Sequence, residues 1–200
     1  MNLRKIKWIF GILFVFLLIL ATNLIDQGNF NKIQKSIKNI YEDRLTAHDI
    51  VYKMTSLMNE KDMANAMSDT IFYRNRNSQL NAELKQLMAD YQETNLSPEE
   101  VASFAELKQH VMALKSAESK SVEAGEYEPQ NIENSIKAIK VDLGLLADLQ
   151  IAEGWRELKS GKKAARSIEM FTQIEIYVLI VLAIIFQVII LYKPRQVKDE

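Results

Sequence analysis

Two long apolar runs near the ends of the chain constrain its fold more than any other feature. Residues 8–25 read WIFGILFVFLLILATNLI and residues 176–192 read IYVLIVLAIIFQVIILY, and neither run contains a charged residue. A helix needs roughly 20 apolar residues, within a range of about 17–25, to cross the hydrocarbon core of a membrane. Trp8, Tyr177 and Tyr192 lie at the ends of the runs, where aromatic rings favour the lipid headgroups. We therefore predict two transmembrane helices.

Cationic residues beside the two runs predict the orientation of the chain. Three precede the first run and three follow the second: Arg4, Lys5, Lys7, Lys193, Arg195 and Lys198. Cationic flanks stay on the cytoplasmic side of a membrane. We therefore expect residues 1–7 and residues 193–200 to be cytoplasmic, and residues 26–175 to form a domain outside the cytoplasm.

A cleaved signal peptide is the alternative for the first run. A short cationic start followed by apolar residues is typical of a signal peptide. This run is long, however, and Ile19, Leu20 and Ala21 make a poor cleavage site. We favour a helix that stays in the chain as an anchor.

The composition of the middle segment argues against several classes of function. Without the six flanking cations and the two terminal acidic residues, the chain keeps 19 basic and 24 acidic residues. This balance offers no basic patch for nucleic acid. The chain contains no cysteine, so a disulfide framework and a thiolate metal site are both excluded.

Apolar residues between the two runs recur at spacings of three and four, which is typical of amphipathic helices packed as a bundle. The first seam continues from the first run, with Arg44 as its one charged position: Ile33, Ile37, Ile40, Ala47, Val51, Met54 and Met58. A helix over residues 66–94 carries the second seam: Leu80, Leu84, Leu87 and Tyr91. The third and fourth seams are Phe104, Leu107, Val111 and Leu114, and then Ile132, Ile136, Ile139, Leu143 and Leu146. The predicted fold is all-α, an up-down-up-down four-helix bundle flanked by two transmembrane helices.

Helix boundaries in the middle segment support this division. Ser97 is a suitable N-cap, Pro98 fits the first helical turn, and Glu100 completes a capping box. Gly125 indicates the end of the third helix, and Pro129 opens the fourth, which we expect to continue into the second apolar run.

Three segments, together with this arrangement of helices, resemble a known family of sensors. They are IYEDRL at residues 40–45, ETNLSPEE at residues 93–100 and LQIAEG at residues 149–154. The chain resembles the four-helix-bundle sensor domain of methyl-accepting chemotaxis receptors. It is most similar to the short, stand-alone versions of that domain from Bacteroidota-type bacteria.

The resemblance implies a homodimer in the inner membrane of a bacterium, with a periplasmic bundle that binds a small ligand near its membrane-distal part. After Tyr192 only KPRQVKDE follows, which leaves no room for the HAMP domain or the methyl-accepting output helices of a full receptor. We therefore expect a separate cytoplasmic or membrane protein to carry the output. The alternative is a structural or accessory protein of a membrane complex that binds no ligand.

Counting positions from the two apolar runs predicts a polar layer in the bundle. Arg44 lies eighteen residues after Asp26, and Glu157 lies eighteen residues before Glu175. In an antiparallel bundle Arg44 and Glu157 should then be level, and we predict a buried contact between them. Three further polar residues should lie at neighbouring levels: His48, Gln150 and Glu153. Such a layer could fix the register of the helices, or it could bind a ligand or shift as the helices slide.

Arg74 and Arg76 are a second candidate site, because arginine holds carboxylates in bidentate geometry. A solvated helix face is the alternative for these two residues. Glu106 and His110 are four residues apart and could hold zinc, but a surface pair is the better interpretation. No catalytic triad, phosphate-binding loop or dinucleotide motif is present. We expect no enzyme, no metal and no cofactor.

Overall fold

The computed structural model describes residues 3–123 and 128–191, which form helices and turns without a strand. These residues divide into two compact units. The terminal unit comprises the described residues of 1–36 and 159–200, and the bundle unit comprises those of 37–158. The predicted helix end at Gly125 and the predicted tail at residues 193–200 lie outside the described residues.

The terminal unit contains the two predicted transmembrane segments. It holds most of α1 (Leu3–Lys38) and the second half of α6 (Pro129–Leu191). Both helices are long and apolar enough to cross a membrane. Large apolar side chains in both segments are exposed: Phe14, Phe16, Leu17, Ile180, Val181 and Ile184. Side chains of this kind suit contact with lipid better than contact with water.

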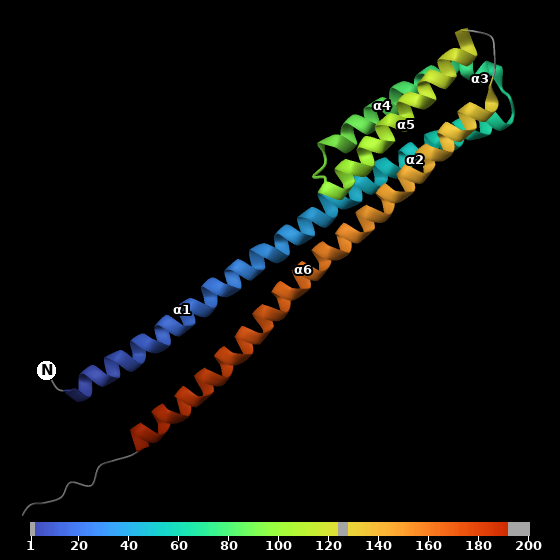
Figure 1. The fold of residues 1–200 in the computed structure, drawn as a ribbon. Helices are drawn as coiled ribbons and strands as arrows, with labels where there is room; N and C mark the ends of the chain where they lie inside the picture. Colours follow the sequence, from blue (N-terminus) through green and yellow to red (C-terminus); the bar gives the residue numbers. More distant parts are fainter. Residues whose placement is uncertain (1–2, 124–127, 192–200) are drawn as a thin grey trace, which may run out of the picture. The chain divides into compact units, whose positions relative to one another are not determined.

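The bundle unit contains four helical columns, as predicted. In Figure 1, α4 and α5 lie side by side along α2 and the first part of α6. The first column is η1 and α2, the second is α3 and α4, the third is α5 and the fourth is the first half of α6. Their bounds are η1 Asn39–Leu45, α2 Thr46–Ala66, α3 Thr70–Asn75, α4 Asn77–Glu93 and α5 Pro98–Glu123.

The core of the bundle unit follows the predicted seams. Every column contributes side chains that are fully or almost fully buried: Met54, Met58, Leu80, Leu84, Phe104, Leu107, Leu114, Ile132, Ile136, Ile139, Leu143 and Leu146. Ile37 is an exception, because its side chain is 62% exposed although the spacing placed it on the first seam. The seams are therefore confirmed from Ala47 onward.

Two local departures from regular α-helix shape the first two columns. Asn39–Leu45 is a π-helix, whose wider turn changes the direction in which later side chains point. The second column begins at Thr70 and not at residue 66, because Ser68 takes a left-handed backbone with φ of 53°. Asp69 then caps α3, and its Oδ1 accepts hydrogen bonds of 3.0 Å from the backbone N–H groups of Ile71 and Phe72.

Candidate functional site

Four polar residues interrupt the apolar core at one end of the bundle unit, and we call them the Arg44 layer. Arg44 lies on η1, Tyr91 near the end of α4, Glu100 in the first turn of α5 and Gln150 on α6. Tyr91 and Glu100 are fully buried, and Gln150 is 2% exposed. The Arg44 side chain is 11% exposed. One layer of charged and polar groups thus connects all four columns.

The Arg44 guanidinium is the centre of this layer. Nη1 donates to both carboxylate oxygens of Glu100 at 3.0 Å and to Oε1 of Gln150 at 3.2 Å. Nη2 donates to the backbone oxygen of Asn95, in the turn between α4 and α5, at 2.9 Å. The Gln150 amide donates to Glu100 and, at 2.9 Å, to the Tyr91 hydroxyl. Burial raises the pKa of Tyr91 to about 12, so this hydroxyl stays protonated at neutral pH.

Glu100 has a second role at the start of α5. The backbone N–H of Ser97 donates to Glu100 Oε2 at 2.6 Å, and the backbone N–H of Glu100 lies 3.3 Å from Ser97 Oγ, to which it donates. The predicted capping box is therefore confirmed. The same carboxylate also neutralises Arg44, a role that the sequence analysis missed. The available signal was that Glu100 lies four residues before Phe104 and so continues the third seam.

The predicted contact between Arg44 and Glu157 is wrong. Glu157 accepts a hydrogen bond of 3.0 Å from the Asn39 side chain, and Arg44 takes its carboxylate from Glu100. The position count compared only the first and fourth columns, so it could not include a partner from α5. It also assumed α-helical geometry through residues 39–45, where the π-helix changes the direction of Arg44.

The remaining candidates of the predicted layer divide into two groups. His48 lies beside Arg44 and Gln150, and together they line an open pocket of about 210 Å³. Nδ1 of His48 is buried, with no hydrogen-bond partner among the described residues. Glu153, in contrast, pairs with Arg156 on its own helix. The structure therefore brings Arg44, His48 and Gln150 together, and it does not bring Glu153 or Glu157 to them.

Arg74 and Arg76 lie at the other end of the second column. Arg76 Nε donates to Glu60 Oε1 at 2.9 Å, and its Nη2 donates to Glu60 Oε2 at 3.3 Å. Both side chains of this pair are about 40% exposed, and Arg74 is exposed as well. Arg76 is thus already paired with a carboxylate of the protein. A role of either arginine in ligand binding stays a prediction.

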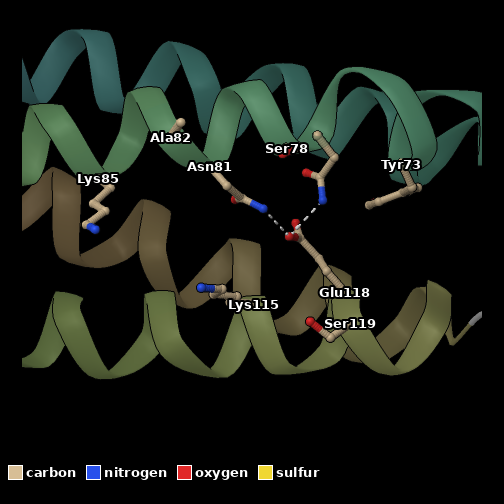
Figure 2. A pocket seen from close by; sticks show the side chains of 9 residues that line it. Tyr73, Ser78, Asn81, Ala82, Lys85, Lys115, Glu118 and Ser119 are labelled. Atoms are coloured by element: carbon tan, nitrogen blue, oxygen red, sulfur yellow. Dashed lines mark hydrogen bonds between the residues drawn. The ribbon is translucent and has the colours of Figure 1, made fainter. Parts of the chain in front are cut away.

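A second group of buried polar residues, the Lys61 cluster, lies between α2, α4 and α5. Lys61 Nζ donates to Glu118 Oε1 at 2.5 Å and to the Asn77 side-chain oxygen. Glu118 Oε2 accepts from the side-chain amide of Asn77 at 2.9 Å. It also accepts from the side-chain amide of Asn81 at 3.0 Å, as Figure 2 shows. Burial lowers the pKa of Lys61, and the nearby Glu118 carboxylate opposes this shift.

The sequence contained a signal for this cluster that the analysis did not use. Lys61 lies three residues after Met58 and continues the first seam, and Glu118 lies four residues after Leu114 and continues the third. Both positions face the interior, since Lys61 is fully buried and Glu118 is 3% exposed. Charged residues at seam positions therefore indicate where the apolar core ends.

Within the described residues, no group of three or more His, Asp or Glu side chains could hold a metal ion. His110, half of the possible zinc pair, has its Nδ1 at 2.6 Å from Asp142 Oδ2 on α6. This contact joins α5 to α6 and does not involve Glu106.

Comparison with known proteins identifies the family. The family model described as a four-helix-bundle sensory module for signal transduction matches residues 3–151. The matched segment includes the Arg44 layer and the Lys61 cluster. No curated protein matches the chain significantly. Since the match covers well over half of its residues, this chain belongs to the family of four-helix-bundle sensory modules for signal transduction, the sensory module of chemotaxis receptors.

Proposed function

We propose that this sensory module is anchored in a membrane, binds a small ligand outside the cytoplasm and signals through a separate output protein. The observation that carries the proposal is the Arg44 layer. It joins η1, the α4–α5 turn and α6 by directional, charge-assisted hydrogen bonds. A displacement of α6 has to break or exchange these bonds, so the layer favours a small number of distinct helix positions.

The π-helix adds to this argument. Arg44 belongs to η1, and π-helical turns are rare and occur frequently at functional sites. The neighbouring groups Arg44 Nε and His48 Nδ1 are buried without a hydrogen-bond partner among the described residues. Unsatisfied groups of this kind can gain a partner when a helix or a ligand moves. The layer is therefore suited to change its bonding between two states of the sensor.

Membrane anchoring explains the exposed apolar side chains of the terminal unit. Phe14 and Phe16 on α1 and Ile184 on α6 are each more than half exposed, an unfavourable state in water. With the cationic flanks in the cytoplasm, a bacterial inner membrane would hold both segments, and the bundle unit would lie in the periplasm. Both ends of the chain would then be cytoplasmic.

A homodimer is the oligomeric state that we propose. Three large side chains on η1 and α2 are exposed although they are apolar or aromatic: Tyr41 at 70%, Leu45 at 57% and Tyr52 at 69%. Leu45 and Tyr52 are seven residues apart, about two helical turns, so they share one side of the first column, and Tyr41 precedes them on η1. A second copy of the chain could cover this strip.

A separate output protein is part of the proposal. Residues 3–123 and 128–191 fold entirely into the bundle and the two apolar segments. No catalytic constellation was identified in the sequence, so we propose a binding protein and not an enzyme. The response would pass to a separate cytoplasmic or membrane protein through α1 or α6.

A thermal-shift screen of the full chain in lipid nanodiscs tests the proposal. The compounds are amino acids, organic acids, nucleobases and divalent metal ions. A ligand at about 100 times its dissociation constant stabilises the folded state by about 2.7 kcal/mol, which raises the unfolding midpoint measurably. If no compound stabilises a well-folded protein, and the chain co-purifies with a membrane complex regardless of solutes, the alternative of a structural or accessory protein is correct.

A further inference from the structure

A groove follows the contact between α4 and α5 on the outside of the bundle unit. It consists of two adjoining open pockets of about 400 and 370 Å³, which share Asn81, Lys85 and Lys115. We call it the α4–α5 groove. Its first half is lined by polar groups, among them Asn77, Ser78 and Ser119. Its second half is lined mainly by apolar groups, among them Leu84, Met88, Val111 and Met112. Each half has the volume of a typical small-molecule site.

Two ammonium groups lie where the halves meet. Figure 2 shows Lys85 on one helix and Lys115 on the other, both at the pocket wall. Both side chains belong to exposed residues, and neither forms an ion pair with any residue that the structure describes. Two cations on facing helices repel each other, and an anion between them relieves this repulsion. The groove therefore favours a negatively charged group at this point.

The nearest buried carboxylate does not supply that charge. Glu118 lines the polar half, but Lys61 binds its Oε1 at 2.5 Å. Its Oε2 already accepts from Asn77 and Asn81. Because Lys61 balances the charge of Glu118, the two groove lysines remain available to an external anion. Arg76 differs from them, since Glu60 occupies its guanidinium.

We propose that the α4–α5 groove binds a small organic carboxylate that carries an apolar group. The carboxylate lies between Lys85 and Lys115, since lysine binds anions as a mobile point charge. The apolar group lies against Met88 and Met112, because methionine side chains adapt to ligands of different shape. The inference names the ligand class of the sensor proposed above and rests on that function.

Asn81 connects the groove to the interior. It lines both halves of the groove and donates to Glu118, which in turn binds Lys61 of α2. A carboxylate that attracts the Asn81 amide competes directly with Glu118 for this donor. Ligand binding between α4 and α5 would then reach the first column through the Lys61 cluster.

Isothermal titration calorimetry on the full chain, in nanodiscs of zwitterionic lipid, tests the proposal. The probes are acetate, isovalerate, phenylacetate, neutral phenylacetamide and inorganic phosphate. We expect the affinity to rise from acetate to phenylacetate and the neutral amide to bind much more weakly. Lys85→Gln and Lys115→Gln should each weaken phenylacetate binding by about tenfold, the effect of losing one charged contact.

Two further variants complete the design. Met112→Ser should weaken phenylacetate binding and leave acetate binding unchanged, since Met112 is 64% exposed and its replacement leaves the core intact. Lys120→Gln is the matched control, because Lys120 is an exposed lysine of α5 outside both groove halves. It should bind phenylacetate as the unchanged chain does. Circular dichroism establishes that each variant is folded.

The outcomes separate this inference from the proposed function. If phenylacetate binds equally well to all lysine variants, the groove is not the site, although the chain is still a sensor. If phosphate binds as tightly as phenylacetate, the groove is a simple anion site and the apolar requirement is wrong. If no carboxylate binds but another class of compound stabilises the chain in the thermal screen, only this inference falls. If no compound of either panel binds, the sensor function falls with it.

Discussion

The Arg44 layer and the Lys61 cluster both place a cation inside the bundle, but they stabilise it with different chemistry. Each continues an apolar seam with a buried cation, and each satisfies that cation with a carboxylate of α5. The Arg44 layer joins all four columns and the α4–α5 turn, and its planar guanidinium donates to several acceptors in fixed directions. The Lys61 cluster omits α6 and uses a lysine whose burial lowers its pKa. The first therefore favours a small number of distinct helix positions, whereas the stability that the second contributes depends on pH and on the charge beside Lys61.

Burial also separates the two groups. Lys61 is fully buried, while the Arg44 side chain retains 11% exposure beside an open pocket. A cation without contact to water depends wholly on its protein partners. The loss of a partner should therefore cost more in the Lys61 cluster than in the Arg44 layer.

The largest effect that we expect comes from Glu118→Gln. This change leaves the Lys61 ammonium buried without a countercharge, and breaking a buried ion pair in this way costs about 3–5 kcal/mol. Chemical denaturation of the full chain in detergent measures the free energy of unfolding. The double variant Lys61→Met/Glu118→Leu is the control and should recover most of the loss, because it removes both charges. A loss below 1 kcal/mol in the single variant would contradict the buried pair.

The next largest effect is a difference in pH dependence between the two groups. The folded-state pKa of Lys61 lies below 10.5, so in the window between that pKa and 10.5 the unfolded chain binds more protons. Stability therefore rises with pH across that window. The pKa of Tyr91 is about 12 when folded and 10.0 when unfolded, so between these values stability falls, by about 2–3 kcal/mol.

Single substitutions show which residue causes each change of stability with pH. Lys61→Met should abolish the rise in the free energy of unfolding below pH 10.5 and keep its fall above pH 10. Tyr91→Phe should keep the rise and abolish the fall. Unfolding free energies measured from pH 6 to pH 12 provide the test. An identical pH profile in both variants would show that neither residue is responsible.

A smaller effect distinguishes the observed partner of Arg44 from the predicted one. Arg44→Met and Glu100→Gln remove two halves of one ion pair, so a double-mutant cycle should give a coupling free energy of about 1–2 kcal/mol. Arg44→Met and Glu157→Gln should be additive within about 0.5 kcal/mol, since Glu157 bonds to Asn39. If the coupling free energy between Arg44 and Glu157 equals that between Arg44 and Glu100, the predicted contact between Arg44 and Glu157 would be correct after all.

Much of this structure could be predicted from the sequence. The fold, the seams and the capping box follow from local rules, because helical periodicity and cap residues act within a few positions of the chain. The position count correctly selected Arg44 and Gln150, since both replace apolar residues on seams. It failed for Glu157 because a partner from a third column depends on how the columns pack.

Other features had only weak signals in the chain. The π-helix over residues 39–45 leaves the sequence spacing unchanged, so the spacing could not reveal it. Lysine is usually a surface residue, and only the place of Lys61 on the first seam indicated that its side chain is buried. The groove lysines Lys85 and Lys115 lie thirty residues apart, and only the packing of α4 against α5 brings them to one groove.

The smallest effect concerns the exposed ion pair between Arg76 and Glu60, which sharpens the contrast with the buried groups. Both side chains are about 40% exposed, so solvent screens the pair, and Arg76→Gln should lower the free energy of unfolding far less than Glu118→Gln does. The cost should fall further in 1 M salt, whereas the cost of Glu118→Gln should stay nearly constant. Arg74→Gln, at an exposed arginine two residues earlier on α3, is the control and should leave stability unchanged. Equal salt sensitivity for Arg76→Gln and Glu118→Gln would mean that water reaches Lys61, and the distinction between the buried and exposed cations would fail.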